Sequence, residues 1–255
     1  MKNITIDPAR VARLLSPDVS LRSGSGVGVN GKFDACVMQA VDWLAGGAGE
    51  TDAPACADPA ISRFCIQLND AAQFAKWRDE LKPYAPRIAG TAGTKEHLET
   101  RSFTAADFAV RVAAPLAFTF WGETIAAERE TAFGLAERLR SLAPIVDKET
   151  ALAGRDVARE ARKATASAAS AAYATYAASA SAASAYAAEY AASAAYADSA
   201  AYTADVASAA SAAYAAYAES AEDVRARADA LARALWDSAL ACLDAMIRVT
   251  EAVEV

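Results

Sequence analysis

Three groups of residues in this 255-residue chain are of types that could do chemistry: a glycine-rich loop, four cysteines and one histidine. The loop, GVGVNGKF at residues 26–33, has the spacing of a phosphate-binding loop as far as Lys32. Phe33 then stands where such a loop needs the Ser or Thr whose hydroxyl binds magnesium. No apolar strand that ends in Asp supplies a second magnesium ligand. We therefore expect a flexible Gly/Ser loop before a helix, with nucleotide binding as the alternative.

The cysteines are spaced too widely for the usual zinc motifs. Cys36, Cys56 and Cys65 are separated by 20 and 9 residues, and Cys242 is remote from all three. Structural zinc sites commonly use close Cys pairs, so this spacing favours buried thiols that pack helices together. The first three cysteines with Asp52 remain an alternative metal site, and Cys36–Cys56 an alternative disulfide in an oxidising compartment. We expect neither a metal nor another cofactor.

The single histidine, His97, lies in the charged run TKEHLET and is expected in solvent. One histidine with no evident nucleophile beside it does not predict Ser/His or Cys/His catalysis. Glu128, Glu130 and Asp147 are carboxylates of the kind that helix surfaces carry routinely. The sequence thus predicts no catalytic residue, and a protein that is not an enzyme.

The elements that position these residues are predicted to be helices, so the fold class is all-α. Asp7 and Asp58 each precede a proline, an arrangement that favours a helix start. Further helices are expected within 33–47, 71–83, 104–122 and 124–143, and Pro115 should kink or interrupt the third of these. The one strand candidate, DVSLRS at 18–23, is too short and solitary to form a sheet. We expect a compact N-terminal helical domain over 1–122 and an Ala-rich helical region over 123–255.

Alanine dominates residues 164–220, where Ser and Tyr recur at intervals of three. Three residues fall about 60° short of a full helical turn, so the tyrosines wind around the helix. Small alanine side chains let helices approach closely, and each tyrosine can then bury on the order of 150–250 Å². We expect at least two breaks between residues 164 and 221, which would give closely packed antiparallel helices rather than one rod. The candidate helix-packing residues are Tyr173, Tyr176, Tyr186, Tyr190, Tyr196, Tyr202, Tyr214 and Tyr217.

The C-terminal segment predicts a more ordinary helix at about 221–252. Ser220 and Asp223 resemble a capping box, and Arg233 lies on the face opposite the apolar stripe. The stripe has spacings of three and four and consists of Val224, Ala228, Leu231, Leu235, Ala239, Cys242 and Met246.

Net charge and hydropathy indicate which partners and which cellular compartment to expect. The net charge of −7 argues against a general nucleic-acid binder, which usually presents a basic face. No run of 18 strongly apolar residues predicts a membrane-spanning helix, and the start MKNITIDPARVARLL lacks the apolar region of a secretory signal. We expect a cytoplasmic protein that has neither nucleic acid nor membrane as a partner.

Three N-terminal stretches carry a resemblance: CVMQAVDWLAGG (36–47), TDAPACADPAISRFCIQLND (51–70) and KPYAPRIAGTAG (82–93). They resemble a family of uncharacterised proteins of high-GC bacteria and their phages. The stretch LRSLAPIVD (139–147) and the Ala-rich tail extend the similarity in layout. Relatives often carry His at the position of Ala53, so this departure weakens a metal site. The family has no established activity, and the resemblance implies only a mobile-element or accessory role.

Together these features predict a non-enzymatic helical interaction or structural protein. Its expected partner is protein: another copy, in a homo-oligomer formed through the Ala/Tyr helices, or one other chain. One alternative is an enzyme or small-ligand binder that uses the Gly-rich loop and the cysteines for a nucleotide or a metal. Another is a phage or mobile-element defence, counter-defence or immunity protein that binds one protein partner.

Overall fold

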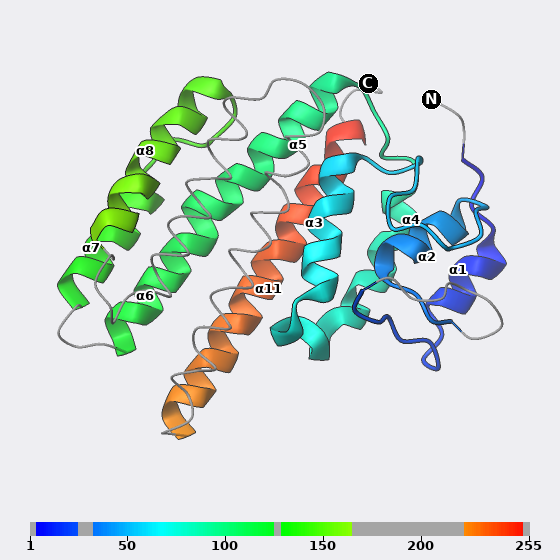
Figure 1. Ribbon diagram of the computed structural model, residues 1–255, viewed down its shortest axis with the longest axis horizontal. Helices are drawn as coiled ribbons and strands as arrows, with labels where there is room; N and C mark the ends of the chain where they lie inside the picture. The colour runs from blue at the N-terminus through cyan, green and yellow to red at the C-terminus, as the bar shows by residue number, and fades with distance from the viewer. Residues whose placement is uncertain (1–3, 25–32, 125–128, 165–221, 252–255) are drawn as a thin grey trace.

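The computed structural model describes residues 4–24, 33–124, 129–164 and 222–251 (Figure 1). Every regular element in these ranges is helical, which confirms the all-α fold class. The strand candidate at 18–23 forms no strand, and Asp34 is an isolated bridge residue beside it. The eight candidate tyrosines, Lys32 and the predicted cap Ser220 lie outside the described residues.

The first helices begin where their capping residues predict. The carboxylate of Asp7 begins α1 (Pro8–Leu14), and that of Asp58 begins α3 (Pro59–Asp70). Each accepts the N–H two residues later at 2.8 Å. Between them, α2 (Val37–Leu44) starts at Cys36 and stops before Gly46. Gly46 has a φ of 94°, a backbone conformation that residues other than glycine rarely adopt.

The predicted helix at 71–83 is present, but as a 3-10 helix, η1 (Ala72–Tyr84). Phe74 and Leu81 are buried and Trp77 is half-buried, so η1 turns an apolar face to the core. Pro83 does not stop the helical path, because the short helix α4 (Ala85–Ile88) continues from η1. The apolar spacing of this segment does not explain why η1 is 3-10 rather than α.

The long central helix begins earlier than its apolar pattern suggests. The first residue of α5 (Lys95–Asp107) lies nine residues before the expected start at 104, and the side chain of the cap Thr94 accepts the N–H of His97. It continues as one π-helical segment, η2 (Phe108–Ala113), and then as α6 (Ala114–Thr124). Pro115 therefore interrupts the α-helix as predicted, since its ring would crowd the preceding turn of a regular helix.

The remaining helices flank this central one (Figure 1). α7 (Arg129–Arg140) packs along α6, and α8 (Lys148–Ala164) lies beside α7. On the other side, α11 (Glu222–Glu251) runs between α5 and α3, with α1, α2 and α4 beyond α3. α8 and α11 both contact α5. The breaks predicted between residues 164 and 221 lie outside the described residues.

One hydrophobic core joins the N-terminal helices and α11. Five residues of the predicted α11 stripe are confirmed as buried, namely Leu231, Leu235, Ala239, Cys242 and Met246. Ala228 is half-buried, and the side chain of Val224 lies outside the described part of the chain. Trp236 is also fully buried and packs against Phe74, with ring centroids 5.3 Å apart. The domain division at residue 122 stays a prediction, although α11 packs against helices on both sides of it.

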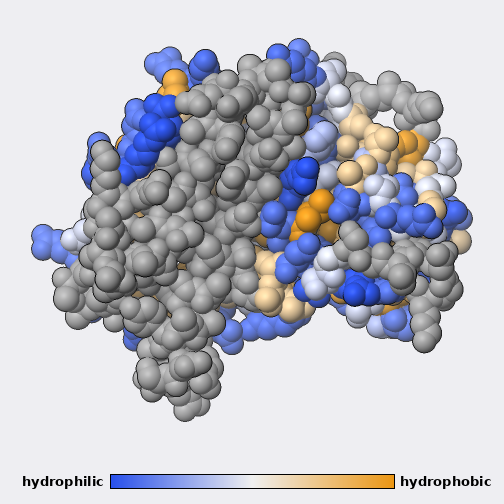
Figure 2. Space-filling model, in the orientation of Figure 1, coloured by the Kyte–Doolittle hydropathy of each residue, from blue (hydrophilic) through white to orange (hydrophobic). Residues whose placement is uncertain are grey.

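The helical stretch Lys95–Phe120 is long and apolar enough to cross a membrane, but 67% of its most apolar window is buried within the fold. A core helix of a soluble protein has the same character. On the face in Figure 2, the hydrophobic residues among the coloured atoms form separate patches between hydrophilic ones. The fold thus uses its most apolar helix as its centre.

Candidate functional site

The cysteines occupy packing positions. Cys36, Cys65 and Cys242 are buried and Cys56 is half-buried, and all four are free thiols. Burial raises the pKa of the thiols of Cys65 and Cys242, with a smaller rise for Cys36 and Cys56. A protonated thiol is a poor nucleophile and a poor metal ligand. The predicted role in helix packing therefore fits the three buried positions.

No cluster of three or more His, Cys, Asp or Glu side chains suited to a metal ion occurs among the described residues. Cys36 instead caps α2, where its sulfur accepts the N–H of Gln39 at 3.5 Å. The described end of the glycine-rich loop, Phe33, packs edge-on against Trp43 with ring centroids 5.8 Å apart. Cys36 thus has a capping contact, and Phe33 has a packing contact, in the described part of the chain.

His97 is not in solvent, which corrects the expectation drawn from its charged neighbours. Only 6% of it is exposed, and its Nδ1 accepts the N–H of Thr94 at 3.3 Å. The N–H of His97 in turn donates to the Thr94 hydroxyl, so the two residues form a capping box at the start of α5. In the charged run, Lys95 and Glu96 are exposed, and helical periodicity turns the third residue of α5 inward together with Leu98.

The expected surface carboxylates are exposed. Glu130 lies in the first turn of α7, while Asp147 accepts the backbone N–H and the hydroxyl of Thr150 at 2.9 and 2.7 Å. These bonds lower the pKa of Asp147. Asp147 thus caps the start of α8, and Glu128 lies outside the described residues.

A buried ion pair that the sequence did not suggest joins three parts of the fold. The guanidinium of Arg101 donates to the Asp58 carboxylate at 2.6 Å and to the Thr91 carbonyl at 2.9 Å. It also reaches α11, where it donates to the carbonyl of Met246 at 2.9 Å and the hydroxyl of Thr250 at 3.2 Å. The Arg101 side chain is 0% exposed and that of Asp58 is 2% exposed. Four hydrogen bonds therefore satisfy a buried charge and fix the C-terminal part of α11 against α3 and α5.

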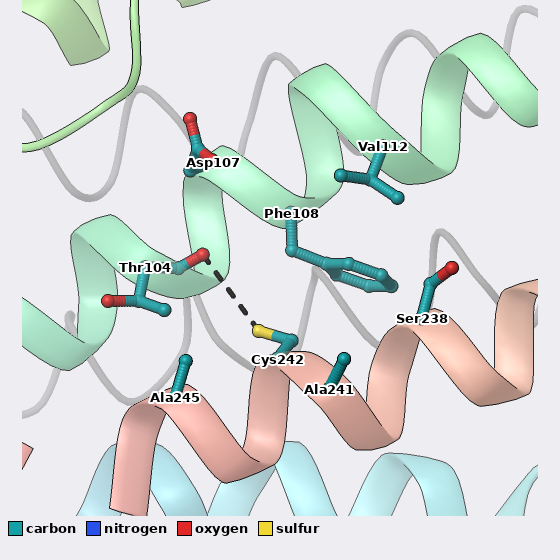
Figure 3. A pocket seen from close by; sticks show the side chains of 8 residues that line it. All are labelled: Thr104, Asp107, Phe108, Val112, Ser238, Ala241, Cys242 and Ala245. Carbon is teal, nitrogen blue, oxygen red and sulfur yellow. Dashed lines mark hydrogen bonds between the residues drawn. The ribbon is translucent and has the colours of Figure 1, made fainter. Parts of the chain in front are cut away.

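A groove of about 310 Å³ lies between the central helix and α11 (Figure 3). Four residues of α5 and η2 form one wall, and four of α11 form the other. They are Thr104, Asp107, Phe108 and Val112, and Ser238, Ala241, Cys242 and Ala245. Figure 3 shows the Phe108 ring between the two helices, and the Cys242 side chain directed at the Thr104 carbonyl oxygen 3.9 Å away.

The two walls differ in character. On α11 the side chains are small, and those of Ala241 and Ala245 are exposed. On the opposite wall, the π-helical segment η2 carries Phe108 and Val112, and single π turns occur often at functional sites. The Asp107 carboxylate accepts the N–H of Ile145 at 2.8 Å and faces away from α11 in Figure 3. The groove is thus apolar at its base and polar along its rim.

Arg111 stands on η2 next to this rim. Its Nη1 donates to Asp107 at 3.0 Å, while its Nε is a buried side-chain donor for which the described residues offer no partner. A second hollow, of about 480 Å³, is lined by Glu123, Arg129, Phe133 and Arg227 at the end of α6.

Comparisons with models of protein families, with curated proteins and with solved structures find no match for this chain. The resemblance to the uncharacterised bacterial and phage family therefore stays an expectation.

Proposed function

We propose that this protein is a non-enzymatic helical interaction protein that associates through close-packed helices. The observation that carries the proposal is the groove between α5–η2 and α11. Its α11 wall is made of Ser238, Ala241, Cys242 and Ala245, all short side chains that let another helix approach closely. An open hollow of about 310 Å³ beside such a wall suits a large side chain from an incoming helix.

The roles of the reactive side chains support the same proposal. His97 caps α5, Cys36 caps α2, and Cys65 lies in the core. Arg101 is committed to Asp58 and to three further acceptors. In an enzyme we would expect some of these groups to line a pocket with free lone pairs or donors.

The chain's own Ala/Tyr segment is the proposed means of association. We propose a homo-oligomer or a complex with one protein partner in the cytoplasm, in the accessory or phage-related setting that the family resemblance implies. Neither nucleic acid nor a membrane is a proposed partner. The acidic net charge of −7 supports this restriction.

Sedimentation velocity on the full chain over a wide concentration range tests the proposal. Replacement of Tyr173, Tyr176 and Tyr186 by serine should weaken self-association at least tenfold, or about 1.4 kcal/mol. Tyr84→Phe, in the described part of the chain, is the matched control and should leave association unchanged. A wild-type chain that stays monomeric, and that is also recovered from its host without a stoichiometric protein partner, would overturn the proposal.

A further inference from the structure

We propose that η1 is a conformational switch between a 3-10 and an α-helical form, with Glu80 as the latch that holds the 3-10 form. The segment Ala72–Tyr84 is 3-10 over 13 residues. Such helices seldom exceed three or four residues, because their hydrogen bonds have poorer geometry than those of an α-helix. The inference goes beyond the proposed function, since it holds whether or not the groove binds another helix.

The amino-acid sequence of η1 favours an α-helix. Most residues of the stretch AQFAKWRDELK (72–82) are of types with high α-helical propensity: Ala, Gln, Lys, Arg, Glu and Leu. Its large apolar residues, Phe74, Trp77 and Leu81, follow one another at spacings of three and four, which is the period of an α-helix. Pro83 would end such a helix, because its ring crowds the preceding turn and it has no N–H to donate. Local preference therefore favours an α-helix over 72–82, so contacts with the rest of the fold must favour the 3-10 form.

One row of η1 side chains shows how the fold selects the 3-10 form. Side chains three residues apart are aligned in a 3-10 helix, and Phe74, Trp77 and Glu80 form such a row. The ring centroids of Phe74 and Trp77 lie 5.3 and 6.4 Å from that of Trp236 on α11. Glu80 accepts the indole N–H of the same Trp236 at 2.8 Å. In an α-helix, Glu80 would point about 120° away from the direction of Phe74, so one of the two would lose its contact with Trp236.

A second row connects η1 to the N-terminal segment Val19–Leu21. Asp79 and Lys82 are also three residues apart, and both bond to this segment. The N–H of Leu21 donates to the Asp79 carboxylate at 2.7 Å, and the Lys82 ammonium donates to the carbonyl of Val19 at 2.6 Å. An α-helix rises less per residue than a 3-10 helix, so the stretch that can become α-helical would shorten by about 5 Å. Because that change moves Asp79 and Lys82, η1 links the N-terminal segment to α11.

Glu80 suits the role of a latch because solvent reaches it. Its carboxylate also accepts from the Arg233 guanidinium at 2.6 Å, and the two side chains are 38% and 41% exposed. Exposed ion pairs contribute little to stability, so this pair opens at small cost. The Asp58–Arg101 pair, with side chains 2% and 0% exposed, has no such freedom. Glu80 therefore joins the protein surface to the buried Trp236, and its release leaves η1 to its local preference for the α-helix.

Nuclear Overhauser effects in the isotopically labelled full chain test the switch. Contacts from an Hα to the amide two residues later mark a 3-10 helix, and contacts to the amide four residues later mark an α-helix. We expect the first kind across 72–82 in the wild type and the second kind in Glu80→Ala. Glu80→Gln keeps an oxygen that accepts the Trp236 N–H, so it should keep the 3-10 form. Asp237→Ala removes the other carboxylate bound to Arg233 and is the matched control, which should also keep it.

Two outcomes of this experiment would overturn the inference. The first is a 3-10 pattern that persists in Glu80→Ala, since the carboxylate would then not hold that form. The second is an α-helical pattern in the wild type, in Glu80→Gln or in Asp237→Ala, since the bond to Trp236 would then not select the 3-10 form.

Amide hydrogen exchange separates the switch from a general loosening of the fold. In Glu80→Ala the N–H of Leu21 should exchange roughly ten times faster than in the wild type, because its acceptor Asp79 moves. The N–H of Ser62, which donates to the carbonyl of Asp58 at 2.9 Å within the first turn of α3, should exchange at an unaltered rate. An equal rise at Leu21 and Ser62, or no rise at Leu21, would contradict the switch.

A second variant decides the question if Glu80→Ala does not fold. Trp236→Phe keeps an aromatic ring beside Phe74 but removes the N–H that Glu80 accepts. We expect the α-helical pattern of nuclear Overhauser effects in this variant as well. A 3-10 pattern in Trp236→Phe would overturn the role of Glu80 as a latch.

Discussion

Asp58 and Arg101 lie 43 residues apart in the sequence and form an ion pair of 2.6 Å that is almost closed to water. Asp58 begins α3, while Arg101 lies in the second turn of α5 and reaches the carbonyl of Met246 on α11. Asp58 therefore has two roles: it caps α3, and it is the counter-charge of Arg101, which links α11 to the core.

Loss of Arg101 should be severe, since it leaves the Asp58 carboxylate buried without its counter-charge. We expect Arg101→Met to lower the free energy of unfolding by about 3–5 kcal/mol in urea melts. Lys76→Met, which removes an exposed ion pair with Asp229, should cost under about 1 kcal/mol. Asp58→Asn keeps a capping side chain, so the double variant Asp58→Asn/Arg101→Met should lose less than the sum of the two single changes. Strict additivity would contradict the coupling.

The α11 stripe makes a second prediction. Leu235 is 0% exposed, so Leu235→Ala should cost about 2–5 kcal/mol. The same substitution at Leu15, which is 46% exposed, should cost under about 1 kcal/mol. Denaturant melts of the two variants provide the comparison, and similar losses would remove the support for a buried stripe. Arg233, expected on the helix face opposite the apolar stripe, instead forms an ion pair with Glu80 at 2.6 Å. Arg233→Ala would therefore be a poor control for Leu235→Ala.

Alanine substitution of two glycines, one in α6 and one in α7, should change stability in opposite directions. A Cβ at Gly122 would come within 2.8 Å of the Phe133 ring and 3.2 Å of the Arg129 carbonyl oxygen. We expect Gly122→Ala to destabilise by about 1 kcal/mol, because the 39% exposed ring can turn aside at modest cost. A Cβ at Gly134 meets nothing within 4 Å, so Gly134→Ala should stabilise α7 by up to about 1 kcal/mol. Thermal melts that shift both variants the same way would refute this packing.

The buried thiols predict a loss of stability at alkaline pH. Burial raises the pKa of Cys65 and Cys242 above that of an exposed thiol, so the folded state holds their protons longer than the unfolded state. The contribution of these two thiols to the free energy of unfolding is fully present below about pH 8. Above about pH 9 it falls by roughly 1.4 kcal/mol per pH unit for each thiol. Urea melts between pH 7 and pH 10 should show a smaller slope for Cys65→Ala/Cys242→Ala than for Cys56→Ala. Equal slopes would argue against two protonated thiols in the core.

The glycine-rich loop should bind no nucleotide, since Phe33 replaces the hydroxyl residue that magnesium needs. Calorimetry with magnesium and ATP should give no heat of binding for the wild type. Lys32→Ala should leave the melting temperature within about 1 °C, because Phe33 already breaks the phosphate-binding motif that would use this lysine. Binding that Lys32→Ala abolishes would instead favour the small-ligand alternative.

Local chemistry in the sequence was enough to predict the starts of α1 and α3 and most of the α11 stripe. Asp7 and Asp58 before proline, and Leu231, Leu235 and Met246 at helical spacing, act within one or two turns, so their outcome depends little on the rest of the fold. The absence of strands among the described residues follows from the same helical periodicity. The acidic net charge likewise follows from the amino-acid composition alone.

Only the tertiary structure decided what the polar residues do. His97 and Arg101 sit in one charged run, yet both are buried, because burial of a polar group depends on partners from Thr94, Asp58 and α11. Thr94 lies in the same run as His97, but the partners of Arg101 come from distant parts of the chain, and no periodicity in the run TKEHLETRSF identifies them. The groove is likewise a product of two helices more than 100 residues apart. Ala241 and Ala245, which the sequence alone shows only as helix formers, become one wall of a groove when α5 and η2 pack beside them, because a groove needs two surfaces and a single helix supplies one.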